Sequence, residues 1–482
     1  MASLTDKTMG GFIWAFGEQF GVQALQMVVF IILARALTPE VFGLMGMLAV
    51  FIAVSQSLTD SGFGQALIQK KETDEVDYSS VFYINLVVST AIYGLLFVSA
   101  PLIASFYGEA ILIDLIRVLG LKFIVAAFSM VQIARLTKKV QFKKLMIAKL
   151  PSTLVGGAAG ITAAYMDYGV WSLIIQQLTD TTAYSIQIWI QSKWRPMWVF
   201  DWKRVKELFD FGSKMMLSGL LNQVSNYIYE ILIGRYYSSA QVGFYTQANK
   251  IRQLPVKNIS NTLSRVTFPV LSEIQNDDKR LRKAYKKVLR QVVFIIAPLM
   301  IGGIVLAKPL FSFVLTDKWL PAVPYFQWLC VAGLFHPINS YNLNILKVKG
   351  RSDLFLWLGV IKKLIEAVCL FFLLSYSVLA LVIFRAAFGF LAYFINSYYS
   401  GLFIDYGVFD QIKDIWKFIF VSLLMGGTIW GITSYVVLGD LLTMIMGVVI
   451  GAIVYIGVIS QVEKGIMHYT VNTIKEFISK RK

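Results

Sequence analysis

The sequence carries few charged residues for its length. Asp, Glu, Lys and Arg make up only 15% of the 482 residues, against about 25% in an average soluble domain. Hydrophobic residues account for 57% of the chain, and the mean hydropathy is +0.65. This composition predicts an integral membrane protein whose long apolar runs cross the bilayer as helices.

Cysteine, histidine and catalytic motifs are also scarce. The two cysteines, Cys330 and Cys369, both lie inside apolar runs, and the two histidines, His336 and His468, are far apart. This argues against a disulfide framework or a metal site. The sequence has no Gly-Lys dipeptide for a P-loop, no G-x-S-x-G, no H-E-x-x-H and no large extracytoplasmic loop. We therefore expect a non-enzymatic protein without metal or cofactor, whose uncleaved first apolar run is its first span.

Apolar runs long enough for a membrane-spanning helix recur along the chain and predict an all-α fold of about 14 transmembrane helices. The predicted spans are 10–37, 41–66, 79–104, 111–134, 145–166, 169–191, 209–235, 240–263, 289–315, 321–346, 353–375, 378–402, 415–437 and 441–462. Residues 240–263 are too polar to face lipid, so this segment either does not cross or turns its polar face to a wet, protein-lined space. The charged stretch 272–290 is expected to lie along the membrane surface.

Basic residues alternate between the loops. Every second loop is rich in Lys and Arg, from Lys70 and Lys71 to the tail residues Lys480, Arg481 and Lys482. The intervening loops are short and nearly free of these residues. The positive-inside rule then puts both termini in the cytoplasm, in a multi-pass protein of the cytoplasmic membrane. The net charge of +17 comes from these loops, so the orientation in the membrane explains it better than nucleic-acid binding does.

The chain repeats itself at a constant offset of 200 residues. Residues 27–48 return near Glu230, so that Arg35 matches Arg235 and Gly43 matches Gly243. Such a repeat predicts two homologous six-helix lobes, 1–200 and 201–404, related as parallel repeats around a central cavity. Residues 405–482 would form an extra helix pair and a basic cytoplasmic tail.

Polar residues follow one face of two matching helices. In the first span these are Gln19, Gln23 and Gln26, with Glu18 beside them, and in the seventh they are Asn222, Asn226 and Glu230. Either they hydrogen-bond between helices, at about 0.6 kcal/mol per contact, or they line a hydrated cavity. We favour the cavity because carboxylates are costly in lipid. Glu18 and Glu230 are the candidates for proton or sodium coupling, with Asp180 and Glu366 as further intramembrane carboxylates.

Basic residues inside spans are the candidates for holding an anionic ligand. Each costs at least ~2.5 kcal/mol at a helix centre, and several lie too deep to reach water by snorkelling. The candidates are Lys122, Lys250, Arg252, Lys362, Lys363 and Arg385, with Gln23, Gln223 and Asn226 as polar neighbours. Glu366, one turn after Lys362, is a competing partner that would neutralise it.

Several stretches resemble the Wzx-type lipid-linked oligosaccharide flippases, polysaccharide transporters of the multidrug/oligosaccharidyl-lipid/polysaccharide (MOP) exporter superfamily, and among them the colanic-acid-exporter-like subgroup. They are residues 33–47, 58–69, 243–277 and 344–353. The resemblance implies a V-shaped bundle of two six-helix lobes. It also implies a secondary transporter that flips an undecaprenyl-diphosphate-linked oligosaccharide by alternating access for cell-surface polysaccharide synthesis, in contact with membrane lipid and a synthesis complex.

Three other functions are compatible with the sequence. A MATE-like drug/cation antiporter of the same superfamily would use carboxylates such as Glu18 and Glu230 in an apolar pocket. A polysaccharide polymerase or ligase would need a large outward loop. A scaffold in a synthesis complex would dock through the basic cytoplasmic loops.

Overall fold

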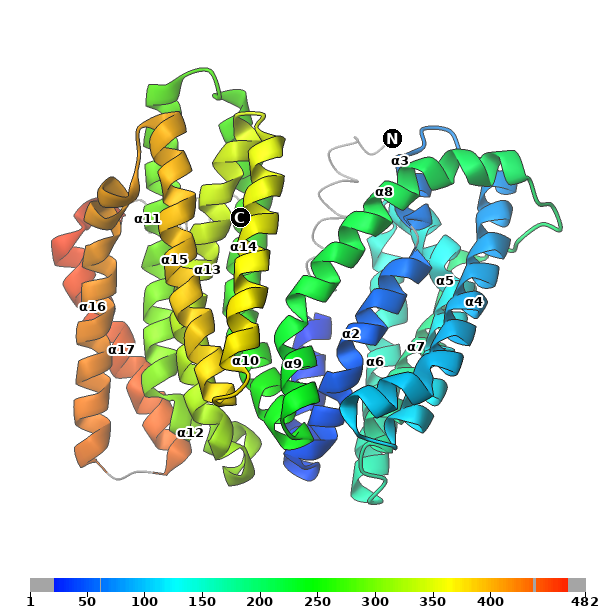
Figure 1. Cartoon of the computed structure of the whole chain (residues 1–482), viewed down its shortest axis with the longest axis horizontal. Coiled ribbons are helices and arrows are strands. Elements are labelled where there is room, and N and C mark those ends of the chain that lie inside the picture. Colours follow the sequence, from blue (N-terminus) through cyan, green and yellow to red (C-terminus); the bar gives the residue numbers. More distant parts are fainter. Residues whose placement is uncertain (1–20, 61, 437–438, 467–482) are drawn as a thin grey trace. The chain divides into compact units, whose positions relative to one another are not determined.

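The computed structural model describes residues 21–60, 62–436 and 439–466, and every regular element in this part of the chain is helical (Figure 1). The contacts divide the chain into two compact units, Met1–Gly243 and Phe244–Lys482. The all-α class is thereby confirmed. The lobes predicted at 1–200 and 201–404 are defined by the sequence repeat rather than by compactness, and they stay a prediction.

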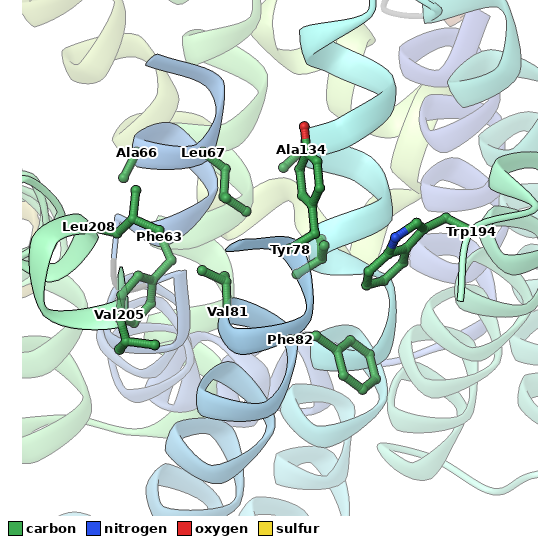
Figure 2. Close-up of a cluster of buried hydrophobic side chains, with 11 residues drawn as sticks. Phe63, Ala66, Leu67, Tyr78, Val81, Phe82, Ala134, Trp194, Val205 and Leu208 are labelled. Carbon is green, nitrogen blue, oxygen red and sulfur yellow. The ribbon is translucent and has the colours of Figure 1, made fainter. Parts of the chain in front are cut away.

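The first unit is built from antiparallel helix pairs. After a helix over Gly21–Ala36 come α2 (Pro39–Asp60), α3 (Phe63–Gln69), α4 (Glu75–Tyr107), α5 (Leu112–Lys138), α6 (Phe142–Tyr165), α7 (Trp171–Ser192), α8 (Trp202–Asn226) and α9 (Ile228–Tyr236). Within this unit α4 packs on α5, α6 on α7, and α8 on α2, α3 and α4. Figure 2 shows the buried cluster where the ends of α3, α4, α5 and α8 meet, with Phe63, Tyr78 and Leu208 among its members.

The second unit continues with α10 (Ser239–Glu273), whose first turn belongs to the first unit. It then contains α11 (Asp278–Val305), α12 (Ala307–Leu315), the 3₁₀ turn η1 (Asp317–Ala322), α13 (Val323–Val348), α14 (Ser352–Leu373), α15 (Val378–Ile404), α16 (Val408–Tyr435) and α17 (Asp440–Val462). In this unit α13 packs on α15 and α11, and α16 packs on α11 and α17.

These helices overlap the predicted spans from the second span on, although the spans 41–66 and 209–235 each contain two helices. Seven helices of the described residues are long and apolar enough to cross a membrane by length and composition. Their outer faces carry exposed apolar side chains, such as Leu102 on α4 and Leu402 on α15, with 72% and 64% of their surface exposed. Side chains of this kind are stable in contact with lipid tails, so the chain is a multi-pass membrane protein.

Two predicted segments differ from the helices in detail. The stretch 272–290 includes the end of α10 at Glu273 and the start of α11, which begins at Asp278 and runs unbroken to Val305; its place along the membrane surface stays a prediction. The side chain of Asp277 caps α11 by accepting from the backbone N–H of Arg280 at 3.0 Å. The predicted span 289–315 is also two helices, since the chain breaks between α11 and α12 at Leu306.

The two copies of the repeat meet at their matching glycines. A side-chain carbon added to Gly43 would lie 1.7 Å from the carbonyl oxygen of Ser239, and one added to Gly243 would lie 2.0 Å from that of Pro39. Pro39 and Ser239 are themselves 200 residues apart, so the contact is reciprocal. Only glycine lets the starts of α2 and α10 approach so closely, which explains why both copies keep it.

A buried network of polar side chains joins α11, α13, α15 and α16. Asn342 and Gln411 exchange two hydrogen bonds, with amide nitrogen to oxygen distances of 3.0 and 3.1 Å. Asn342 also accepts from the Tyr285 hydroxyl at 2.5 Å and donates to Ser397 Oγ at 3.0 Å. Because the bilayer core offers no water to these groups, the network specifies which helices pack together.

We expect Asn342→Leu to destabilise the second unit by about 2–4 kcal/mol. The substitution keeps the branched shape of the side chain but leaves Tyr285, Ser397 and Gln411 each short of a partner, and each orphaned buried group costs about 1–3 kcal/mol. The free energy of unfolding in an SDS titration measures this. Thr428→Val is the matched control, because it removes only a hydrogen bond to the Leu424 carbonyl within α16. Equal losses in the two variants would contradict the role of the network.

Candidate substrate-binding site

Three polar side chains line one face of α10. Tyr245, Asn249 and Arg252 follow one another at spacings of four and three residues, which puts them on the same side of a helix. Their exposed fractions are 0%, 4% and 4%. Arg252 Nη2 donates to Asn249 Oδ1 at 2.5 Å, so a guanidinium is held inside the second unit by its own helix.

A second guanidinium, that of Arg385 on α15, reaches the same face. Arg385 Nη1 donates to the Tyr245 hydroxyl, and its guanidinium carbon lies 5.9 Å from the centre of the Tyr245 ring. Between them, on α13, His336 is exposed and interacts electrostatically with both Arg252 and Arg385. The structure thus brings together two of the predicted cations that are more than a hundred residues apart in sequence.

The position of Arg252 depends on a glycine, Gly333, on the neighbouring helix α13. A carbon added to Gly333 on α13 would lie 3.0 Å from Arg252 Cδ and 2.7 Å from Met300 Sδ. Gly333 therefore makes room for the arginine stem between α10 and α13. Two guanidinium groups that both act on His336 repel each other, and an anion close to both would lower the electrostatic energy.

Lys362 on α14 is held by a chain of amides. Its exposed fraction is 9%, and its Nζ donates to Asn396 Oδ1 at 2.6 Å. Asn396 in turn donates to Asn339 Oδ1 at 2.9 Å. Among the described residues Lys362 makes no ion pair with Glu366, whose charge acts on Lys363 instead. The expectation that Glu366 neutralises Lys362 is therefore wrong, and a neutral amide is its partner.

The other predicted basic residues lie apart from this site. Lys363 is exposed on α14, and Lys250 is exposed on the side of α10 opposite Arg252. In the first unit, Lys122 on α5 donates to Gln177 Oε1 at 3.3 Å, with its Nζ 5.5 Å from the Phe123 ring centre.

The polar residues predicted on one face of the first and seventh spans lie only partly within the described residues. Glu18 and Gln19 lie outside the described residues. Gln23 and Gln223 are half-buried, and Asn226 is exposed at the end of α8. Glu230 is buried in the first turn of α9, where its carboxylate interacts electrostatically with Tyr107 and Tyr227. Asp180 is ion-paired with Lys149 at 2.7 Å, which argues against a free coupling carboxylate there.

Sequence reasoning missed His336, Tyr245 and the amide pair Asn339 and Asn396. A signal was present for each amide, since an Asn in the middle of an apolar helix is costly in lipid unless it is bonded. His336 was considered only as a metal ligand. Tyr245 and Arg385 lie on different helices, α10 and α15, so no spacing pattern within one helix could predict that they pair.

Comparisons with known proteins agree with this fold. A solved structure of the lipid II flippase MurJ, in an inward closed conformation, superposes with a TM-score of 0.76 at 16% identity, covering 94% of this chain and all of that one. Likeness at this identity shows the fold alone. The fold that the two chains share is an all-α membrane fold.

The sequence comparisons give the family. Residues 32–324 match the model of a family described as "Polysaccharide biosynthesis protein", and the chain belongs to this family. It is 28% identical over 360 residues to the teichuronic acid biosynthesis protein TuaB of Bacillus subtilis, covering 74% of each chain. It is 24% identical over 362 residues to the lipopolysaccharide biosynthesis protein WzxC of Escherichia coli, covering 75% of this chain and 74% of that one.

The contact between Tyr245 and Arg385 predicts coupled energetics. In a double-mutant cycle, Tyr245→Phe and Arg385→Leu should show a coupling free energy of about 0.5–1.5 kcal/mol in unfolding, because each substitution alone removes the same hydrogen bond. Tyr245→Phe combined with Lys363→Leu is the control, and it should be additive to within about 0.5 kcal/mol. Additivity in both cycles would show that the bond contributes nothing.

Proposed function

We propose that this protein flips an undecaprenyl-diphosphate-linked oligosaccharide from the cytoplasmic to the outer leaflet of a bacterial cytoplasmic membrane. Transport proceeds by alternating access, with both termini in the cytoplasm, and serves cell-surface polysaccharide synthesis. The observation that carries the proposal is the pair Arg252 and Arg385, gathered around His336 inside a membrane protein of a polysaccharide biosynthesis family.

The chemistry of the substrate fits this pair. A diphosphate carries charge that has to be compensated where water is scarce, and the planar guanidinium bonds phosphate oxygens in pairs. The polyprenyl tail is as apolar as lipid and needs no protein channel. Lys362, held by Asn396 at 2.6 Å, is a further buried cation of the second unit, and its partner is a neutral amide that leaves its charge uncompensated.

Export assays test the role of the two arginines. In a strain lacking the gene, lipid-linked repeat units should accumulate facing the cytoplasm, and the wild-type gene should restore polysaccharide export. Arg252→Ala and Arg385→Ala should each lower export about 10- to 100-fold, since a charge-assisted hydrogen bond contributes about 1.5–3 kcal/mol.

Lys308→Ala, which removes an exposed cation from α12, is the matched control and should export normally. Normal export by both arginine variants at normal expression would refute the cationic site. Resistance to cationic dyes conferred by the wild-type protein, with no accumulation of lipid-linked units in the deletion strain, would instead point to a drug/cation antiporter.

For the energy source we propose that transport is coupled to protons or sodium ions through Glu230. Of the two predicted coupling carboxylates, Glu18 and Glu230, only Glu230 lies within the described residues. Its burial, at 4% exposed, makes the charged form costly, so binding a cation there would be favourable. In proteoliposomes, flipping by the wild type should respond to an imposed proton or sodium gradient, and flipping by Glu230→Gln should not. A full gradient response in Glu230→Gln would exclude this residue as the coupling group.

A further inference from the structure

A second group of basic side chains surrounds a cavity in the first unit. The cavity measures about 440 Å³ and lies where α4 and α6 begin and α5 and α7 end, within the range of about 300–1,000 Å³ typical of small-molecule sites. Its charged lining consists of Glu75, Arg135, Lys139, Lys144, Lys193 and Arg195; we call it the basic pocket. By the positive-inside rule this end of the helices is cytoplasmic.

The single carboxylate of the basic pocket is already engaged. Arg135 Nη2 donates to Glu75 Oε1 at 2.7 Å and Nη1 to Oε2 at 3.3 Å. The indole nitrogen of Trp194 donates to Glu75 as well. The rings of Tyr78 and Trp194 have centres 6.2 Å apart (Figure 2), and these centres lie 5.3 and 5.9 Å from the guanidinium carbon of Arg135. Glu75 therefore neutralises Arg135 and fixes it in place, and its single negative charge does not compensate the other cations.

The remaining acidic residues at the start of α4 are also paired away from the pocket. Asp77 bonds Lys70 at 2.8 Å, and Asp74 bonds Arg204 at 2.5 Å. A hydrogen bond from the backbone N–H of Asp77, together with the Arg204 guanidinium, holds the pKa of Asp74 below its ordinary value. These carboxylates are engaged by other cations, and they leave the pocket lysines uncompensated.

Three lysines of the basic pocket have no side-chain partner within the described part of the chain. They are Lys139 and Lys193, both exposed, and the half-buried Lys144. Lys193 adopts φ +53° and Val140, next to Lys139, adopts φ +55°. Left-handed backbone is costly for residues other than glycine, and for a β-branched residue above all. Strain of this kind is retained at sites where it aims side chains at a ligand.

An apolar rim adjoins the basic pocket. Met197 lines the cavity, and the residues after it, Trp198, Phe200 and Trp202, are 94%, 48% and 63% exposed. Aromatic side chains gather at the level of lipid headgroups, where one part of the ring meets acyl chains and another meets water. A cationic pocket beside an apolar rim matches the two parts of an anionic phospholipid, its charged head and its acyl chains.

We propose that the basic pocket binds the phosphate of an anionic phospholipid from the cytoplasmic leaflet, with the acyl chains against Met197, Trp198 and Phe200. Lys139, Lys144 and Lys193 supply the charge, and Glu75 holds the pocket open through Arg135 and Trp194. A free phosphate compound would use the same lysines, but it would gain nothing from the exposed aromatic rim. The site is separate from the one formed by Arg252 and Arg385, and its test does not involve transport.

Native mass spectrometry of the full-length protein in detergent tests whether the charge of the pocket lysines binds an anionic lipid. Phosphatidylglycerol should bind the wild type at least tenfold more tightly than phosphatidylcholine. The triple variant Lys139→Gln/Lys144→Gln/Lys193→Gln should lose about 10- to 100-fold in affinity for phosphatidylglycerol. The matched control Lys71→Gln/Lys279→Gln/Lys283→Gln removes three exposed lysines outside the pocket, and it should stay within twofold of the wild type.

Equal losses in the two triple variants, or equal binding of the two lipids by the wild type, overturn the proposal. The thermal unfolding midpoint of each variant without added lipid verifies that the pocket variant is folded. If that variant fails to fold, the single variants Lys139→Gln and Lys193→Gln, both at exposed positions, provide the same comparison, with an expected loss of several-fold each.

A second measurement separates lipid from free phosphate. Dihexanoyl-phosphatidylglycerol should bind at least tenfold more tightly than glycerol 3-phosphate. Trp198→Ser/Phe200→Ser should weaken the lipid about tenfold and leave glycerol 3-phosphate unchanged. If the two ligands bind equally and the aromatic substitutions change neither, the pocket holds a free phosphate compound and the lipid assignment is wrong.

Discussion

A polar group buried in a bilayer has to find its hydrogen-bond partner within the protein, and this constraint accounts for much of the second unit. Asn342 and Gln411 bond each other between α13 and α16, and Lys362 reaches Asn396 between α14 and α15. Apolar side chains alone would distinguish poorly between alternative helix pairings, because lipid tails are as apolar as leucine. The polar pairs therefore select the pairing of helices.

The same constraint separates two kinds of basic residue. Near the helix ends, Arg135 and Arg204 bond carboxylates at the start of α4, and their pairing fixes the ends of the helices. Arg252 and Arg385, by contrast, meet around Tyr245 and His336. Cations that act on one another inside a membrane protein raise its free energy, and this cost is the physical basis of the anion site that we propose.

Much of the candidate site was predictable residue by residue. Arg252, Lys362 and Arg385 stood out because charge in an apolar run is costly wherever it occurs. Their grouping was not predictable: Arg252 and Arg385 meet, whereas Lys250, only two residues from Arg252, points to the opposite side of α10. Lys122 lies on α5 with Gln177 as its partner. His336 and Gly333 matter only because α13 passes between these helices.

The sequence by itself determined the helical membrane class, nearly all helix positions and the repeat at 200 residues, because hydropathy and periodicity are local properties of the chain. The tertiary structure decided which polar groups become partners: Lys362 bonds Asn396 rather than Glu366, and Gly43 fits against Ser239. It also gathered the lysines at the ends of α5, α6 and α7 into a single pocket. Such contacts depend on how helices cross, and crossing is set by side chains that are far apart in sequence.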